Sequence, residues 1–172
     1  MAESFVQNFN HLKIHSQFSI CEGALKIDDL KDFSKENKLK SLGLCDTINL
    51  CGALEFSEKL SKIGTQPIIG TQINFKYADT IGLLPLFALN EKGYKNIIEL
   101  SSSSYLKNDS ISEPYLNLDE LSKKNEGVAL FSGTINGLSG QLFNKGKFLD
   151  IRELYFKLKT IFGDRFYIEI QR

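Results

Sequence analysis

Short apolar runs alternate with amphipathic stretches along most of this chain of 172 residues, and this alternation constrains its fold more than any other feature. The segment Leu83–Ala88 is a continuous apolar run, as expected for a strand that is buried on both faces. In the stretch 27–38, Ile27, Leu30 and Phe33 recur every three residues, which predicts one apolar helix face. Repeated strand and helix units imply parallel strands joined by crossover helices. We therefore expect an α/β fold.

The same two patterns predict the remaining elements. Strands are expected at 11–14, 42–45, 67–73, 127–131 and 166–170, and helices at 51–63, 91–100, 118–124 and 151–162. The polar stretch 101–114 is predicted to be a long surface loop, and the glycine-rich segment 133–137 a turn. The chain ends just after an apolar strand without a closing helix, so we expect 1–172 to be one domain that is cut before a barrel closes.

The charge balance and the cysteines narrow the possible partners. Lys and Arg together number 21, as do Asp and Glu, so the chain has no net charge that would draw it onto DNA or anionic lipid. Its three cysteines are irregularly spaced, which argues against a disulfide framework and against a zinc knuckle. No stretch reaches the roughly 18 apolar residues of a membrane span, and no signal peptide is apparent. We expect a cytoplasmic protein with no membrane partner.

Ionisable residues fall where the predicted strands end. His15 and Glu22 follow the first strand, Asp46 follows the second, and Glu169 lies on the last. Sites in parallel α/β folds collect at the carboxyl ends of strands. A single histidine is more often a structural hydrogen-bonding group than a ligand, so the spacing leaves open both a metal site and a purely structural role.

Six sequence blocks, in order, resemble one family. The segment His11-Leu-Lys-Ile-His15-Ser-Gln-Phe-Ser-Ile-Cys-Glu22 is similar to the first motif of the polymerase-and-histidinol-phosphatase (PHP) domains that head bacterial DNA polymerase III alpha subunits. The segments 44–56 and 62–72 resemble the second and third motifs, and 90–102, 128–133 and 162–171 follow in the family's order. The resemblance spans nearly the whole chain.

The resemblance implies a fold and an ancestral chemistry. PHP domains are distorted, TIM-like α/β barrels of seven strands, of which this chain would be a partial copy. Active members hold two or three Zn, Mn or Fe ions that activate water and hydrolyse phosphoesters, in some polymerases as a 3′–5′ exonuclease. The parent enzyme would be a DNA-directed DNA polymerase, a nucleotidyltransferase that uses Mg²⁺.

Several positions depart from the family's ligand pattern. Where the family has metal ligands, this sequence has Lys13, Thr47, Gln72, Leu83 and Thr134. The vestigial ligands are His15, Glu22, Asp46 and Glu169. An ammonium group at Lys13 would repel metal ions, and two or three ligands cannot hold a multinuclear cluster. We expect no catalytic residue and no cofactor in this segment.

The resemblance therefore implies a scaffold within a replicative polymerase. This loss of metal ligands is similar to that in polymerases that leave proofreading to a separate exonuclease subunit, for which the PHP domain is a docking platform. The partners would be the rest of the alpha subunit, the exonuclease subunit, and DNA through the parent enzyme. The alternatives are an active metal-dependent phosphoesterase or 3′–5′ exonuclease, and a stand-alone interaction module.

Overall fold

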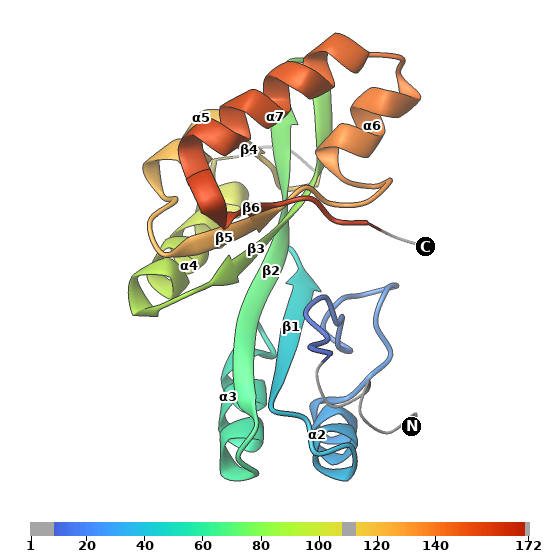
Figure 1. Ribbon diagram of the computed structural model, residues 1–172, viewed down its shortest axis with the longest axis vertical. Helices are drawn as coiled ribbons and strands as arrows, with labels where there is room; N and C mark the ends of the chain where they lie inside the picture. Colours follow the sequence, from blue (N-terminus) through green and yellow to red (C-terminus); the bar gives the residue numbers. More distant parts are fainter. Residues whose placement is uncertain (1–8, 108–112, 171–172) are drawn as a thin grey trace. The chain divides into compact units, whose positions relative to one another are not determined.

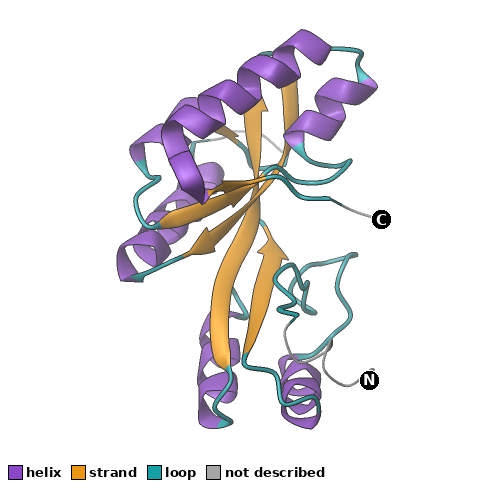
Figure 2. Cartoon of the chain, in the orientation of Figure 1, coloured by secondary structure: helices purple, strands orange, loops and turns teal. Residues whose placement is uncertain are grey.

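The computed structural model describes residues 9–107 and 113–170, and the chain divides into two compact units between Thr71 and Gln72 (Figure 1). Both units combine strands with helices (Figure 2). The long strand β2 (Gln66–Tyr77) begins in the first unit and ends in the second. Each unit has its own set of buried apolar side chains.

The first unit is built on one strand and two helices. It contains α2 (Ile27–Glu36), β1 (Ser41–Thr47) and α3 (Ala53–Lys62), followed by the first residues of β2, which pairs with β1. The two helices pack against each other, because each places an apolar stripe toward the same core. That core consists of Ile27, Leu30, Leu39, Leu42, Leu44, Phe56 and Leu60.

The sequence predicted a strand at 11–14, and this prediction is wrong. The segment runs beside β1 and is hydrogen-bonded to it but is not a strand. The carbonyl oxygens of His11 and Ile14 accept hydrogen bonds from the backbone N–H groups of Gly43 and Cys45, at 2.7 and 2.8 Å. A Cβ atom at Gly43 would lie 2.3 Å from the carbonyl oxygen of Leu12. The close approach therefore requires glycine at this position of β1.

An exposed ion-pair network joins α2 to α3 and should make the stability of the first unit depend on pH. Lys59 Nζ lies 2.7 Å from Asp28 Oδ1 and 2.7 Å from Glu55 Oε1. The hydrogen bond from Lys59 lowers the pKa of Asp28 below its ordinary value of 3.8. A lowered carboxyl pKa stabilises the folded state above the unfolded-state value, and this contribution disappears as the pH falls through the lower folded-state pKa.

We expect Asp28→Asn to lower the thermal unfolding midpoint by roughly 1–3 °C near pH 7, because the pair is exposed. The difference from the parent should close as the pH falls below 3.8. Scanning calorimetry across pH 2–7 measures both effects. Glu58→Gln, which removes another exposed carboxylate of α3, is the control and should leave the unfolding midpoint near that of the parent at pH 7. A difference that persists at pH 2 would assign the effect to packing instead.

The second unit holds most of the sheet. After the end of β2 come β3 (Thr80–Ala88), α4 (Glu91–Leu106), β4 (Leu116–Asn117), α5 (Leu118–Lys123), β5 (Val128–Phe131), α6 (Leu138–Asn144), α7 (Phe148–Phe162), the short 3₁₀ helix η1 (Gly163–Arg165) and β6 (Phe166–Tyr167). The strand order is β2-β3-β5-β6, with β4 paired to β2. The largest fully buried side chains of this unit are Phe75, Phe162, Ile73, Leu84, Leu86, Ile97 and Leu100.

The expected α/β fold class is confirmed, but the strands are not all parallel. The pairs β2–β4 and β5–β6 are parallel, whereas β3 runs antiparallel to β5. Only two residues, Ala78 and Asp79, connect β2 to β3, and only antiparallel strands can be joined by so short a turn. Ala78 has a φ of 52° in this turn, where glycine or asparagine would have marked a hairpin in the sequence.

One prediction within this unit is wrong, and one helix was not predicted. The serines at 101–104 were expected in a surface loop but lie in α4. Ser101 and Ser104 are buried, and the Ser104 hydroxyl finds its partner within the helix, since it donates to the Ser101 carbonyl at 2.7 Å. The rest of the predicted loop includes 108–112, which lie outside the described residues. Helix α6 was not expected at all. No helix in the described ranges is both long and apolar enough to cross a membrane.

Candidate functional site

Asp46 lies at the end of β1 and is only 1% exposed. Asp46 Oδ1 accepts hydrogen bonds from the Ser16 backbone N–H at 2.6 Å and from the Ser19 hydroxyl at 2.7 Å. Asp46 Oδ2 accepts from the Ser16 hydroxyl at 2.7 Å. Both carboxylate oxygens therefore hold the loop that follows the segment 11–14.

Thr47 fixes the same loop from the next residue of β1. Its backbone N–H donates to the Ser19 hydroxyl oxygen at 3.0 Å, and its own hydroxyl donates to a carboxylate oxygen of Glu22. Within the loop, the Gln17 N–H donates to the Leu25 carbonyl at 2.8 Å. The structure thus brings Glu22, Asp46 and Thr47 into one hydrogen-bonded cluster.

The two histidines of the chain have different surroundings. His11 is exposed and makes edge-on ring contacts with Phe9 and Phe33, at centroid distances of 4.8 and 6.0 Å. His15 is half-buried, and its Nδ1 atom is buried without a hydrogen-bond partner among the described residues. Lys13 lies between them and is also half-buried.

The remaining predicted positions belong to the second unit. Gln72 is buried on β2, and Leu83 is half-buried near the start of β3. Thr134 and Glu169 are brought together, since both line a cavity of about 560 Å³. The Glu169 backbone N–H donates to the Ser132 hydroxyl at 2.9 Å, which ties the chain after β6 to the chain after β5.

Sequence reasoning missed the partners of Asp46. Ser16 and Ser19 are both buried, and the Ser19 N–H donates to the Ser16 carbonyl in a turn at 2.9 Å. A pair of serines three residues apart, directly after the segment that carries His15, was the available signal. Within 9–107 and 113–170, no three His, Cys, Asp or Glu side chains are grouped so that they could hold a metal ion.

Residues 11–172 match the profile of the PHP domain, and the chain belongs to this family. Two of the relatives that it resembles have the same name. It is 37% identical over 183 residues to the "DNA polymerase III subunit alpha" of Caulobacter vibrioides, a match that covers 100% of this chain and 16% of that protein. The subunit of the same name from Borreliella burgdorferi is 36% identical over 180 residues, covering 98% of this chain and 16% of the relative.

The chain thus spans a small part of the curated relatives it matches, about 16% of their length. The resemblance to PHP domains of DNA polymerase III alpha subunits is confirmed over the whole chain. Among solved structures, a candidate metal-dependent phosphoesterase from Bifidobacterium adolescentis superposes with a TM-score of 0.45 at 17% identity, over 86% of this chain and 54% of that one.

Proposed function

We propose that this chain is the PHP segment of a replicative DNA polymerase III alpha subunit, in which it is a structural and docking element and not a hydrolase. The observation that carries the proposal is the commitment of the Asp46 carboxylate to Ser16 and Ser19. A carboxylate has about four acceptor sites, and here three hydrogen bonds already occupy three of them. One site on Oδ2 is left for a metal ion, and an ion that bound both oxygens would displace contacts that fold the loop.

The other ligand positions support the same proposal. Thr47 stands where the family has a histidine, and its hydroxyl holds the Glu22 carboxylate. Gln72, Leu83 and Thr134 offer an amide, an isobutyl group and a hydroxyl, which bind divalent cations poorly or not at all. Lys13 adds a positive charge. The donor set that remains, His15, Glu22, Asp46 and Glu169, does not fit a cluster of two or three ions, and we propose that these four residues are vestigial.

One observation favours the alternative of an active phosphoesterase. The Nδ1 atom of His15 is buried without a hydrogen-bond partner among the described residues, and an imidazole nitrogen of this kind is a possible metal ligand. Measuring the metal content therefore separates the two functions directly.

We expect the purified polypeptide to carry less than one equivalent of Zn, Mn and Fe together, measured by plasma mass spectrometry after dialysis against metal-free buffer. Hydrolysis of a phosphodiester reporter should not exceed that of the His15→Ala variant, with or without added Mn²⁺. Two or more bound ions per chain, with cleavage that chelators and His15→Ala both abolish, would establish the phosphoesterase instead.

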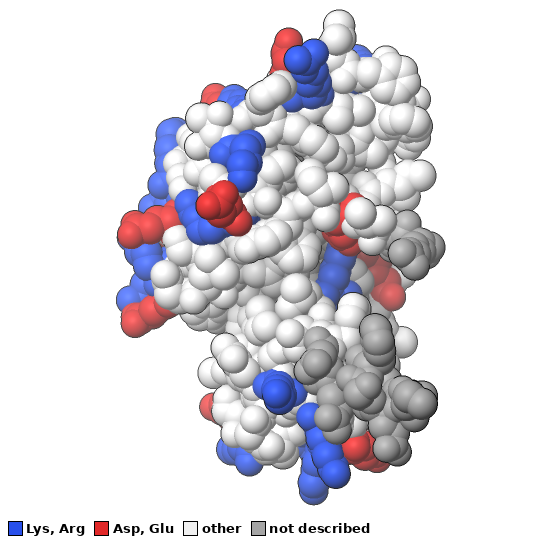
Figure 3. All heavy atoms as spheres, in the orientation of Figure 1, with Lys and Arg blue, Asp and Glu red and all other residues white. Residues whose placement is uncertain are grey.

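The partners follow from the parent enzyme. Figure 3 shows Lys and Arg side chains interspersed with Asp and Glu, without one continuous basic area on that face. A chain with no net charge offers little long-range attraction for a phosphate backbone, so DNA would be reached through the rest of the alpha subunit, a cytoplasmic polymerase that uses Mg²⁺.

The exonuclease subunit is the proposed docking partner. Calorimetry tests this docking when the exonuclease subunit from the same organism is titrated into the alpha subunit, either with or without the PHP segment. If the exonuclease subunit still binds after the segment is deleted, the PHP segment is not its docking site.

A further inference from the structure

The turn between β5 and α6 contains the one Asn-Gly pair of the sequence, Asn136-Gly137. The Gly137 N–H closes this turn by donating to the Thr134 carbonyl at 2.9 Å. A Cβ atom at Gly137 would lie 2.9 Å from the Cα atom of Gly133, so the packing of the turn requires glycine at this position. Because glycine has no side chain, its backbone nitrogen is not shielded from the side chain of the residue before it.

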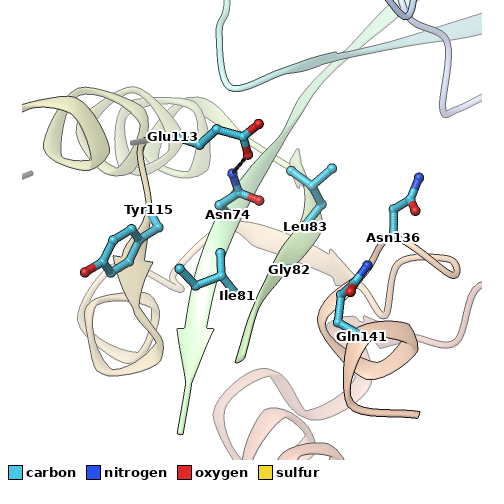
Figure 4. Close-up of a pocket in the computed structure, with 8 residues that line it drawn as sticks. All are labelled: Asn74, Ile81, Gly82, Leu83, Glu113, Tyr115, Asn136 and Gln141. Atoms are coloured by element: carbon cyan, nitrogen blue, oxygen red, sulfur yellow. Dashed lines mark hydrogen bonds between the residues drawn. The ribbon is translucent and has the colours of Figure 1, made fainter. Parts of the chain in front are cut away.

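The side chain of Asn136 is exposed and is held by no other group. Its amide makes no hydrogen bond to another described residue. Figure 4 shows Asn136 at the edge of a cavity of about 400 Å³, without a hydrogen bond to the other residues that line it. The buried Asn96 differs, since its amide nitrogen donates to the Glu126 carbonyl at 2.8 Å. Water reaches the Asn136 amide, and this amide can turn toward the Gly137 nitrogen.

The main chain around the Asn-Gly pair is packed closely against β3. A Cβ atom at Gly82 would lie 2.5 Å from the Cα atom of Leu138, so β3 and the start of α6 approach as nearly as two backbones can. The Leu83 N–H donates to the Asn136 carbonyl at 3.3 Å. Both contacts depend on the normal length of the main chain between Asn136 and Leu138.

We propose that Asn136 is a deamidation site, and that its isoaspartate product separates the start of α6 from β3. The proposal depends on the chemistry of the Asn-Gly pair and on the packing around it, and not on the polymerase parent. The Gly137 N–H must first leave the Thr134 carbonyl, so the reaction proceeds from molecules in which this turn has opened locally.

The reaction needs water and base alone. The Gly137 nitrogen loses its proton to hydroxide and forms a bond to Cγ of Asn136. The bond from Cγ to Nδ2 then breaks, and ammonia leaves with a proton taken from water. Water opens the resulting succinimide ring in one of two ways: cleavage of the bond from nitrogen to Cγ gives aspartate, and cleavage of the bond from nitrogen to the main-chain carbonyl carbon gives isoaspartate. One water molecule is consumed and one ammonia is released.

The two products should affect the structure differently. Aspartate leaves the main chain unchanged, so the carbonyl of residue 136 can still accept from the Leu83 N–H. In isoaspartate the main chain passes through the former side chain and is longer by one methylene group, while the former carbonyl becomes a free carboxylate. The acceptor of the Leu83 N–H is then displaced, and Leu138 cannot keep its close contact with Gly82.

Peptide mapping by mass spectrometry tests the proposal on the purified polypeptide after incubation in mildly alkaline buffer. We expect conversion at Asn136, seen as the mass shift for the exchange of NH₂ for OH. Conversion should be faster at higher pH, because the Gly137 nitrogen must lose its proton. Asn144 is the internal control, since it is also exposed but precedes Lys145, whose side chain shields the backbone nitrogen. Asn144 should remain intact.

Two variants separate the chemistry from its structural effect. Asn136→Gln keeps the amide but requires a six-membered ring, so the mass shift should be lost. Ion exchange isolates the converted protein, and methylation by an isoaspartyl methyltransferase identifies its isoaspartate fraction. This fraction should lose hydrogen-exchange protection at the Leu83 amide, whereas freshly purified Asn136→Asp should keep it.

Three results would refute the proposal. The first is an intact Asn136 in the folded protein under conditions that convert a peptide of residues 132–141. The second is conversion of Asn144 as fast as that of Asn136. The third is an isoaspartate fraction in which the Leu83 amide remains as protected as in the parent.

Discussion

Asp46→Ala should destabilise the folded chain by about 3–5 kcal/mol, because three buried donors then lose a charged acceptor. The Ser16 backbone N–H and the hydroxyls of Ser16 and Ser19 all donate to this carboxylate. Ser16 and Ser19 are almost completely buried, so water cannot replace the lost partner without opening the loop. Urea unfolding followed by circular dichroism measures the loss.

Two variants and one reagent separate this structural role from metal binding. Asp46→Asn keeps one acceptor oxygen and should cost roughly 1–2 kcal/mol. Asp32→Ala removes an exposed carboxylate of α2 and should change the free energy of unfolding by less than about 0.5 kcal/mol. A chelator should leave the stability of the parent protein unchanged. If the chelator destabilises the parent as much as Asp46→Ala does, the carboxylate binds a metal ion.

Gly93→Ala should cost about 3 kcal/mol or more, because the added methyl group collides with backbone and not with a movable side chain. A Cβ atom at Gly93 would lie 1.8 Å from the carbonyl oxygen of Gly127. That oxygen already accepts a hydrogen bond from the Leu89 N–H at 2.8 Å. Asn90 caps α4 at the same point by accepting from the Gly93 N–H at 2.9 Å. The variant must therefore separate the start of α4 from the residue before β5.

Gly146→Ala is the matched control for this second prediction. Gly146 has a φ of 71°, but no atom lies within 4 Å of an added Cβ atom. The substitution should therefore lower the free energy of unfolding only through the strained backbone conformation, by about 1 kcal/mol. Urea unfolding ranks the two variants, and faster hydrogen exchange at the Leu89 amide should accompany Gly93→Ala alone. A loss for Gly93→Ala no larger than that for Gly146→Ala would contradict the collision, because Gly93 lies in α4 and has no positive φ that an alanine would strain.

Periodicity predicted the helices and central strands because burial on one face is visible in the residue pattern. Helices α2, α3 and α7 and the continuous run of β3 are found where the pattern placed them, although Phe33 of α2 is exposed at 42% and not part of the core. Ser101 and Ser104 misled the prediction, since a serine that donates to the carbonyl of the preceding turn can be buried inside a helix. The hairpin at Ala78 was missed because a residue other than glycine takes the left-handed conformation there.

The candidate site was predictable in part, because the apolar run of β1 shows where this strand ends. Asp46 and Thr47 are the residues at that end. The roles of Ser16 and Ser19 could not be inferred, because they depend on how a loop between distant elements folds back onto a carboxylate. Nor could a periodic pattern predict that Asn74 lines a cavity together with Asn136 and Gln141, since Asn74 lies on β2 and the other two lie just before and within α6.

The reversed direction of β3 relative to β5 has a practical consequence for labelling the protein. Leu86 pairs with Leu130 and Ala88 with Val128, so the beginning of β3 lies toward the residues that follow β5, and its last residue lies near the beginning of β5. Leu89, exposed at 57%, is therefore remote along the strand from Gly82 and Leu83 at its other end. A fluorophore attached at Leu89 would report on the surroundings of the start of β5 and leave the beginning of β3 untouched.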